Sequence, residues 1–339
     1  MDIHSNIPLK NFTTMKLGGP AKIIAEAHTD ADVAEIYTDA KLKSLPVFVL
    51  GGGSNVIAKD EGFDGVVIRI RIPGFEVIKD EPGSATIKIG AGENWDEAVR
   101  RITDLNLSGV ECLSAVPGTA GAAPVQNIGA YGQEIADTLE SLTAYDSQQD
   151  TFVTLTASDC GLSYRNSIFR DSEKGRYVIT SITLKLSKNQ PAPPFYENLQ
   201  KYLDENNIHI YDVKTIRRAI INIRTNKLPD PKLLPNSGSF FKNAIIEDWQ
   251  LSDLRKTNPD MPAYDMGEGK FKLSTGWMIE QTGLKGQLIH GMRVHDKNAL
   301  VLINESANSY LDLALARQEI IDAVRNKFNV TIEQEPLEV

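Results

Sequence analysis

Three residues in this chain have side chains that could bind or protonate a substrate. Arg165 follows a tyrosine, Ser239 stands between a glycine and two phenylalanines, and Glu335 lies in an acidic tail. A guanidinium can grip a carboxylate through two parallel hydrogen bonds, and a rigidly held hydroxyl or carboxyl group can transfer a proton. Each also has an ordinary explanation, as a surface ion pair, a turn or cap serine, and a solvated tail. Residue type alone leaves both interpretations open.

A glycine loop follows a predicted buried strand at 46–50. It reads Gly51-Gly52-Gly53-Ser54-Asn55. Backbone amides without side chains can approach a diphosphate closely, and the serine and asparagine can add hydrogen bonds. The loop lacks the Gly-Lys-Ser/Thr of a Walker A loop and does not match GxGxxG. A phosphate cradle and a tight structural turn both remain possible.

A second stretch, 117–132, is rich in small residues. Such a run lets the backbone lie against a flat ligand such as an isoalloxazine ring, although a closely packed structural loop has the same composition. The candidate ligand-lining residues are Pro117, Gly118, Gly121, Gln126, Asn127, Gly129, Ala130, Tyr131 and Gly132.

Length and composition limit the class of protein. A chain of 339 residues exceeds the usual single core, so two or three domains are expected. The net charge of -9 gives no basic face for nucleic acid, although local cations could still bind a small anion. Cys112 and Cys160 form no metal-binding pattern, so we expect no metal site and a reducing compartment. The N-terminus lacks the apolar core of a signal peptide, and no apolar run is long enough for a membrane helix. We therefore expect a cytoplasmic protein.

Alternating strand and helix patterns predict an α/β architecture. A helix should begin at Thr29-Asp30, and another should be capped by Asn94. Apolar residues share one face of a helix near the C-terminus, where core packing is the expected role. The predicted strands lie at 46–50, 66–70, 85–89, 141–145 and 177–186, with an irregular segment at 114–132 and a linker or surface loop at 190–194.

These segments together resemble the UDP-N-acetylenolpyruvoylglucosamine reductase family. The similarity runs from 13–21 to the tail, and four motifs occur in the family's order. They are the glycine loop, the segment 117–132, the Tyr164-Arg165 pair and the run 238–243. Each motif is weak alone, but four in order are specific.

The resemblance implies a fold and a domain division. The expected fold is the FAD-binding, vanillyl-alcohol-oxidase-like (PCMH-type) fold, of mixed α+β and α/β class. Two α/β subdomains would bind FAD, and a C-terminal α+β domain would bind the substrate. The expected ranges are 1–70 completed by 320–339, 71–228, and 229–319, with the FAD-binding region at about 17–187.

The resemblance also implies the reaction. NADPH would reduce FAD, and UDP-N-acetylglucosamine enolpyruvate would then be reduced to UDP-N-acetylmuramate, a peptidoglycan precursor. Hydride transfer from the flavin to the vinyl carbon places negative charge beside the carboxylate. Arg165 and Glu335 match the residues that stabilise this charge, and Ser239 matches the proton donor. We expect a monomer that binds no nucleic acid or membrane.

Five further residues match the family's substrate contacts. Tyr196 would close over the nucleotide-sugar, and the lysines and asparagine would contact uracil or diphosphate. The full set is Tyr164, Tyr196, Lys227, Asn243 and Lys272.

Two departures from the family pattern stand out. The Pro-rich excursion around Tyr196 resembles the longer of the family's two types, whereas 13–20 resembles the shorter. The tail lacks the usual Glu-Val-Arg, so Glu333 and Glu338 remain alternatives to Glu335.

Two other functions compete with this one. An alcohol or hydroxy-acid oxidase could share the flavin fold, but many such enzymes attach flavin through His or Cys, and neither occurs in 51–55. A non-enzymatic nucleotide-binding module would keep the cradle without the chemistry. The joint presence of Arg165, Ser239 and a tail glutamate argues against it.

Overall fold

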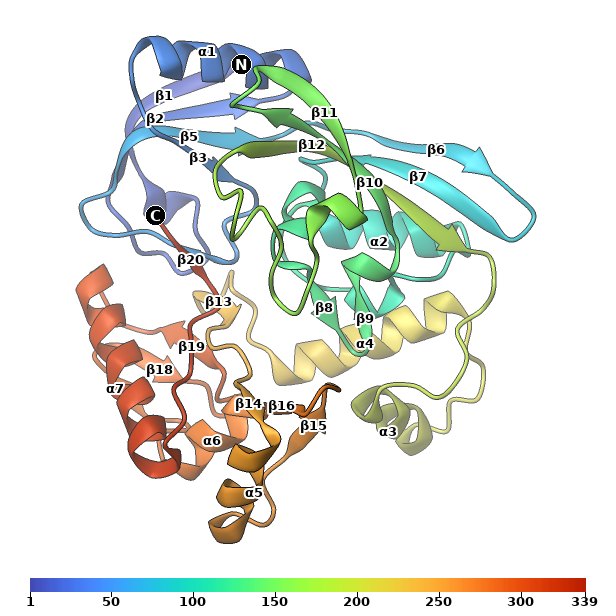
Figure 1. Ribbon diagram of the computed structural model, residues 1–339, viewed down its shortest axis with the longest axis vertical. Coiled ribbons are helices and arrows are strands. Elements are labelled where there is room, and N and C mark those ends of the chain that lie inside the picture. Colours follow the sequence, from blue (N-terminus) through green and yellow to red (C-terminus); the bar gives the residue numbers. More distant parts are fainter. The chain divides into compact units, whose positions relative to one another are not determined.

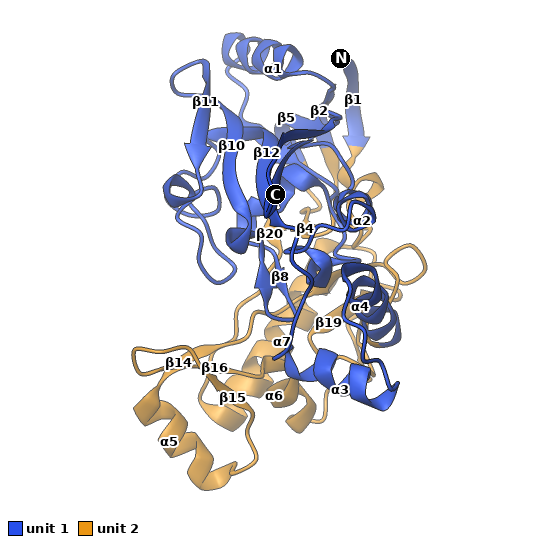
Figure 2. Ribbon diagram, turned by 90° about the vertical axis from the view of Figure 1, so that its right-hand side faces the viewer, with its two compact units in different colours: residues 1–7, 21–53, 63–226 blue, residues 8–20, 54–62, 227–339 orange.

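The structure is a computed structural model that describes residues 1–339. The chain forms two compact units, each built from segments distant in sequence (Figure 2). Unit 1 comprises 1–7, 21–53 and 63–226, and unit 2 comprises 8–20, 54–62 and 227–339. No helix is both long and apolar enough to cross a membrane.

Unit 1 contains a mainly parallel sheet and a larger antiparallel sheet (Figure 1). The first has the order β1-β2-β5-β3 and the second β11-β10-β12-β7-β6. A small hairpin, β8-β9, lies in the glycine-rich segment. The strands are β1 (Asp2–Pro8), β2 (Pro20–Ala27), β3 (Val47–Leu50), β5 (Phe63–Ile70), β6 (Phe75–Asp80), β7 (Ser84–Gly90), β8 (Gly129–Ala130), β9 (Gln133–Glu134), β10 (Leu139–Asp146), β11 (Thr151–Thr156) and β12 (Tyr177–Ser187).

One hydrophobic core joins the two sheets of unit 1. Helix α1 (Asp30–Leu42) packs against β5 and β10, and α2 (Trp95–Asp104) buries its apolar face in the same core. A capping box begins α1. The Thr29 hydroxyl accepts a hydrogen bond from the backbone amide of Asp32, and the Asp32 carboxylate accepts one from the backbone amide of Thr29. Asn94 caps α2 by accepting the amide of Glu97. Both predicted helix starts are confirmed.

Two further helices complete unit 1. Helices α3 (Glu197–Glu205) and α4 (Val213–Lys227) share a separate apolar cluster that includes Leu199, Leu203 and Ile216. The predicted linker at 190–194 leads into α3. All of α4 except its last residue belongs to unit 1, and that residue, Lys227, begins the C-terminal segment of unit 2.

Unit 2 is a mixed α+β assembly around its own core. Its sheets have the orders β13-β19-β18-β17, β14-β16-β15 and β20-β4. The strands are β4 (Val56–Ile57), β13 (Asn236–Ser239), β14 (Ile245–Glu247), β15 (Ala263–Asp265), β16 (Lys270–Leu273), β17 (Leu288–Ile289), β18 (Met292–Val294), β19 (Val301–Asn304) and β20 (Leu337–Glu338). The helices are α5 (Asp248–Thr257), α6 (Thr275–Gln281) and α7 (Tyr310–Phe328).

The apolar stripe predicted near the C-terminus lies on α7. Five of its residues are buried in the core of unit 2, as predicted, and they are Leu313, Ala316, Ile320, Val324 and Phe328. Ile321, which was predicted to share this face, is only partly buried against the core. All five predicted strands are also confirmed, and the segment 114–132 is irregular apart from short 3-10 turns and the two residues of β8. The expected boundaries at 70 and 228 stay a prediction.

Candidate active site

The glycine loop packs directly against the start of the second ligand-lining segment. A Cβ on Gly51 would lie 2.7 Å from Thr119 Oγ1, and one on Gly52 would lie 2.9 Å from Gly118 Cα. Gly118 itself has a φ of +127°, a conformation that L side chains rarely adopt. The two loops therefore meet backbone to backbone, which requires small residues on both. Sequence reasoning did not single out Thr119, although it lies inside the predicted segment.

Asn127 has a structural role in the irregular segment. It is buried in a left-handed conformation, with φ 46°. Its amide nitrogen donates to Glu134 at 2.8 Å and to the Ser163 carbonyl at 3.1 Å, and its oxygen accepts the Ala136 amide at 3.1 Å. Protein groups thus engage both N–H donors of the carboxamide and one lone pair of its oxygen.

Arg165 is held in a strained backbone conformation beside the same segment. Its φ is 53°, which costs free energy for a residue with a Cβ and is common at functional sites. Nη2 donates to the Gly129 carbonyl at 3.0 Å, and a Cβ on Gly129 would lie 3.2 Å from Nη1. The guanidinium also stands 5.4 Å from the centroid of the Tyr164 ring. A glycine at 129 thus makes room for the arginine.

Two predicted ligand-contacting tyrosines meet in unit 1. The rings of Tyr131 and Tyr196 are 6.1 Å apart in an edge-to-face arrangement. Tyr196 stands at the N-terminus of α3 and is 42% exposed, so its ring can contact a ligand. Burial raises the pKa of Tyr131, while nearby Arg224 opposes that rise.

In unit 2, the chain segments that carry Ser239 and Glu335 run side by side. Ser239 ends β13, where it pairs with Val301 of β19. The next residue, Phe240, donates its amide to Leu300 at 2.6 Å and accepts the amide of Glu335 at 2.8 Å. The acidic tail therefore runs beside the Ser239 strand, and the backbone on both sides of the serine is fixed.

The three tail carboxylates have different surroundings within unit 2. Glu335 is 9% exposed, whereas the Glu333 side chain is 75% exposed and lies 3.5 Å from Lys242 Nζ. Glu338 accepts a hydrogen bond from Tyr310 at 2.7 Å and pairs with Arg317. Burial alone would raise the pKa of Glu338, but these two partners hold it below its ordinary value. Glu338 therefore serves to anchor the tail.

The remaining candidate contacts also fall in unit 2. Asn243 accepts the amide of Thr275 at 3.1 Å, at the N-terminus of α6. Lys272 lies on β16, with its ammonium 5.8 Å from the centroid of the Tyr264 ring. Lys227 is the exposed last residue of α4.

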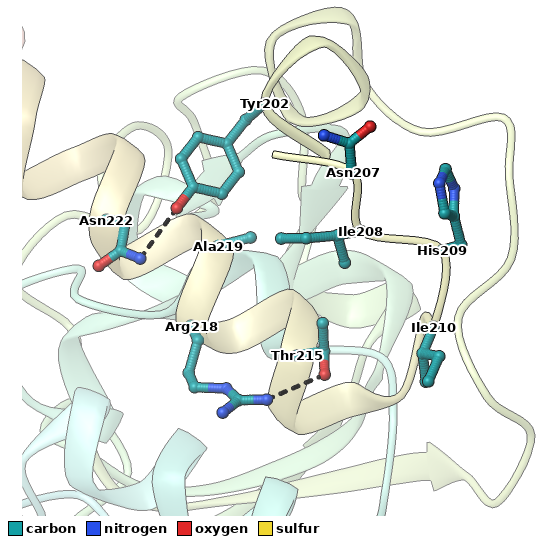
Figure 3. Close-up of a pocket in the computed structure, with 9 residues that line it drawn as sticks. All are labelled: Tyr202, Asn207, Ile208, His209, Ile210, Thr215, Arg218, Ala219 and Asn222. Carbon is teal, nitrogen blue, oxygen red and sulfur yellow. Dashed lines mark hydrogen bonds between the residues drawn. The ribbon is translucent and has the colours of Figure 1, made fainter. Parts of the chain in front are cut away.

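A surface cavity of about 620 Å³ lies away from all of these residues (Figure 3). Its apolar lining residues are Ile208, Ile210 and Ala219, and Asn222, which also lines it, donates to the Tyr202 hydroxyl at 2.9 Å. Arg218 donates to Thr215 at 3.1 Å along the same helix. No predicted site residue lines this cavity.

One cluster of possible metal ligands occurs in unit 1. Asp2, Glu26 and His28 bring ligand atoms within 4.8 Å of one another. His28 lies 3.5 Å from Asp2, and Glu26 pairs with Arg69. These three residues are exposed or half-exposed, and their ion pairs explain why they lie together without a metal.

Comparison with known proteins decides the family. The FAD binding domain model matches residues 21–156, and the model of the UDP-N-acetylenolpyruvoylglucosamine reductase C-terminal domain matches 230–339. A UDP-N-acetylenolpyruvoylglucosamine reductase of Ralstonia nicotianae is 40% identical, covering 97% of each chain. One of Neisseria gonorrhoeae is 39% identical, covering 97% of this chain and 95% of that protein.

The chain belongs to the UDP-N-acetylenolpyruvoylglucosamine reductase family. The crystal structure of a family member from Thermus caldophilus matches it with a TM-score of 0.69 at 21% identity, covering 100% of this chain and 99% of that one. The predicted fold is therefore confirmed: PCMH-type FAD-binding subdomains followed by an α+β C-terminal domain.

Proposed function

We propose that this protein uses NADPH and FAD to reduce UDP-N-acetylglucosamine enolpyruvate to UDP-N-acetylmuramate for peptidoglycan precursor synthesis. The observation that carries the proposal is near-full-length identity of up to 40% with curated reductases of this name. The loops and strands that bear the family's motifs add support, because they have the local geometry that binding and proton transfer require.

The residues fit an FAD diphosphate and ring. Gly51 and Gly52 approach Thr119 and Gly118 so closely that a Cβ on either glycine would clash, so the loop backbone carries no side chains at these two positions. Loops of this kind present amides to phosphate oxygens. We propose that 51–55 hold the diphosphate and that the segment 117–132 lines the flavin. When bound, FAD would supply the hydride that reaches the vinyl carbon of the substrate.

Protein residues would stabilise the negative charge of the intermediate and supply the proton that it takes up. Hydride addition leaves a carbanion beside the substrate carboxylate, and Arg165 would hold that carboxylate through its guanidinium. Ser239 would donate its hydroxyl proton to the carbanion, which is basic enough to take it. Glu335 would help to stabilise the charged intermediate. Its burial beside Phe240 favours it over the exposed Glu333 and the anchored Glu338.

We assign substrate recognition to the remaining candidate residues. Tyr164 and Tyr196, both in unit 1, would contact the sugar nucleotide. The Tyr164 ring lies beside the Arg165 guanidinium, and the Tyr196 ring lies beside the Tyr131 ring. Lys227, Asn243 and Lys272 would contact the uracil or diphosphate. We also propose that the enzyme acts in the cytoplasm, where nucleotide-sugars are made, and as a monomer.

The two half-reactions test this proposal. Without oxygen, NADPH should bleach the yellow flavin of the purified protein, and the enolpyruvyl UDP-sugar should restore the colour. A protein that never takes up FAD would contradict the enzyme assignment. Rapid oxygen reduction with an alcohol, and no response to the UDP-sugar, would instead favour an oxidase.

A further inference from the structure

The C-terminal tail is hydrogen-bonded to two other segments of unit 2. On one side, Glu335 donates its amide to the carbonyl of Phe240, the residue after Ser239, at 2.8 Å. On the other side, Leu337 donates its amide to the Asn55 carbonyl at 3.0 Å, and β20 pairs in parallel with β4. The backbone of the tail thus connects the end of β13 to the last residue of the glycine loop.

One side chain of the tail spans Glu335. The carboxamide nitrogen of Gln334 donates to the Pro336 carbonyl at 3.1 Å, and its oxygen accepts a hydrogen bond from Nη1 of Arg317. Gln334 also forms an isolated backbone bridge with Phe241. A single carboxamide therefore ties the backbone on both sides of Glu335 to an arginine of α7.

The same arginine also binds the end of the tail. Nη1 of Arg317 pairs with the Glu338 carboxylate, which accepts a second hydrogen bond from the Tyr310 hydroxyl at 2.7 Å. Tyr310 and Arg317 are seven residues apart, so both side chains project from the same side of α7. The guanidinium lies 6.0 Å from the centroid of the Tyr310 ring. One guanidinium thus holds tail side chains before and after Glu335.

Helix α7 is a firm support for this arginine. Its apolar stripe is buried in the core of unit 2, and the amide of Tyr310 donates to both carboxylate oxygens of Asp60, at 2.8 and 2.9 Å. The Arg317 side chain is 22% exposed, whereas that of Arg325 is 53% exposed and pairs with Asp322 of its own helix. Salt and water screen a shielded ion pair less than an exposed one. The contact of Arg317 with the tail is therefore the stronger of the two.

We propose that Arg317 is a positioning residue for Glu335: by holding Gln334 and Glu338, it fixes the backbone that carries the Glu335 carboxyl group. Arg317 acts through the tail and not on the substrate. The inference rests on the proposed function, because that function assigns Glu335 to the charged intermediate. A displacement of about 1 Å in such a group can slow a reaction roughly 100-fold, even when the altered residue is distant from the chemistry.

Variants of two arginines on α7 test the proposal in the FAD-loaded protein. Arg317→Met removes the guanidinium and keeps an apolar stem, and Arg317→Lys keeps a charge but loses the fork. Arg325→Met is the matched control, since it removes an exposed guanidinium from the same helix. Arg317→Met is also combined with Glu335→Gln. Stopped-flow absorbance measures flavin reduction by NADPH and flavin reoxidation over a range of UDP-sugar concentrations.

We expect Arg317→Met to lower the maximal rate of flavin reoxidation about 10- to 100-fold. The half-saturating concentration of the UDP-sugar and the rate of flavin reduction should stay near wild type, because the lost stabilisation acts on the intermediate and not on the bound substrate. Arg317→Lys should fall between Arg317→Met and wild type, and Arg325→Met should match wild type.

The double variant separates positioning from a general structural role. In the Glu335→Gln background, Arg317→Met should slow reoxidation by less than about 3-fold, because residues that act as a unit are not additive. A purely structural arginine would slow reoxidation by the same factor in both backgrounds.

Equal losses in the two backgrounds, or wild-type reoxidation in both Arg317 variants, would overturn the proposal. So would wild-type reoxidation in Glu335→Gln, since Arg317 would then have no catalytic group to position. If Arg317→Met does not fold, Arg317→Lys takes its place in both backgrounds. A wild-type protein that ignores the UDP-sugar would contradict the proposed function. Normal wild-type turnover with equal losses in the two backgrounds would contradict this inference alone.

Discussion

At the residue scale, backbone contacts support the proposed role of Ser239 as the proton donor. It ends a paired strand, and the neighbouring Phe240 is fixed by hydrogen bonds to Leu300 and Glu335. A hydroxyl on such a rigid segment keeps its direction, which proton transfer requires, and loses little conformational entropy when the substrate binds. A serine is a weak acid, so its role depends on the basicity of the carbanion that it meets.

The donor role predicts a split between the two half-reactions. Ser239→Ala should leave flavin reduction by NADPH intact, because that step needs no serine proton. Flavin reoxidation by the enolpyruvyl substrate should slow by roughly two to four orders of magnitude. Stopped-flow absorbance measures both rates. Ser237→Ala is the control. It removes a hydroxyl from the same strand, and that hydroxyl is buried and has no hydrogen-bond partner in the protein. Wild-type reoxidation in Ser239→Ala would rule out the donor role.

The tail makes a second prediction at this scale. Glu335→Gln should lower kcat by roughly 10- to 1000-fold, because it removes a buried carboxyl group beside the Ser239 strand. Glu333→Gln should leave kcat near wild type, since that side chain is exposed and pairs only with Lys242. Steady-state kinetics of both variants decides between them. The reverse pattern would move the catalytic assignment to Glu333.

At the scale of elements, the glycine loop and the 117–132 segment act as a pair. Their backbones meet at Gly52 and Gly118, where a Cβ on Gly52 would lie 2.9 Å from Gly118 Cα. The glycines therefore have a packing reason as well as a proposed ligand-binding reason. The close packing supports the tight structural turn, and the phosphate cradle stays a prediction.

This pairing predicts an effect of one methyl group. Gly52→Ala would place a Cβ 2.9 Å from Gly118 Cα, so the two loops must separate. We expect a stability loss of about 1–3 kcal/mol and a lower FAD-to-protein ratio after purification. Gly83→Ala, whose Cβ meets nothing within 4 Å, should change neither. Absorbance ratios and thermal melting compare the two. Full flavin content in Gly52→Ala would contradict the cradle.

The ion pair between Asp96 of α2 and Arg217 of α4 predicts that the stability of the fold depends on pH. Burial alone would raise the pKa of Asp96, but Arg217 and the Ala115 amide hold it below its ordinary value. A carboxylate with a lowered pKa stabilises the fold above its ordinary pKa, and that contribution is lost as the pH falls through the lowered value. Asp96→Asn should therefore cost about 1–2 kcal/mol at neutral pH, after allowance for partial exposure.

Urea unfolding of wild type and Asp96→Asn at several pH values measures this difference. It should stay constant from about pH 5 to 8 and shrink as the pH drops below about 4. A difference that grows in acid would mean that Asp96 is not held as the anion.

At the scale of the whole molecule, local patterns predicted much of the fold. Helix caps at Thr29 and Asn94, and the apolar stripe of α7, depend on neighbouring residues and so can be found in the sequence. Membership of unit 2 by 8–20 and 54–62 depends on contacts between distant segments, which no local pattern encodes.

The candidate site shows the same limit. The motifs single out Ser239 and Arg165 as candidates, and they leave Glu333 as an alternative to Glu335. Burial separates them, and burial is a tertiary property.

The most direct test of the account is NADPH consumption without oxygen, measured with and without the enolpyruvyl UDP-sugar. We predict that continuous NADPH oxidation requires the sugar and that one NADPH is consumed for each product molecule. The product should exceed the substrate in mass by two hydrogens, one from the hydride and one from the proton. NADPH oxidation that proceeds equally without the sugar, or a sugar of unchanged mass, would contradict the account.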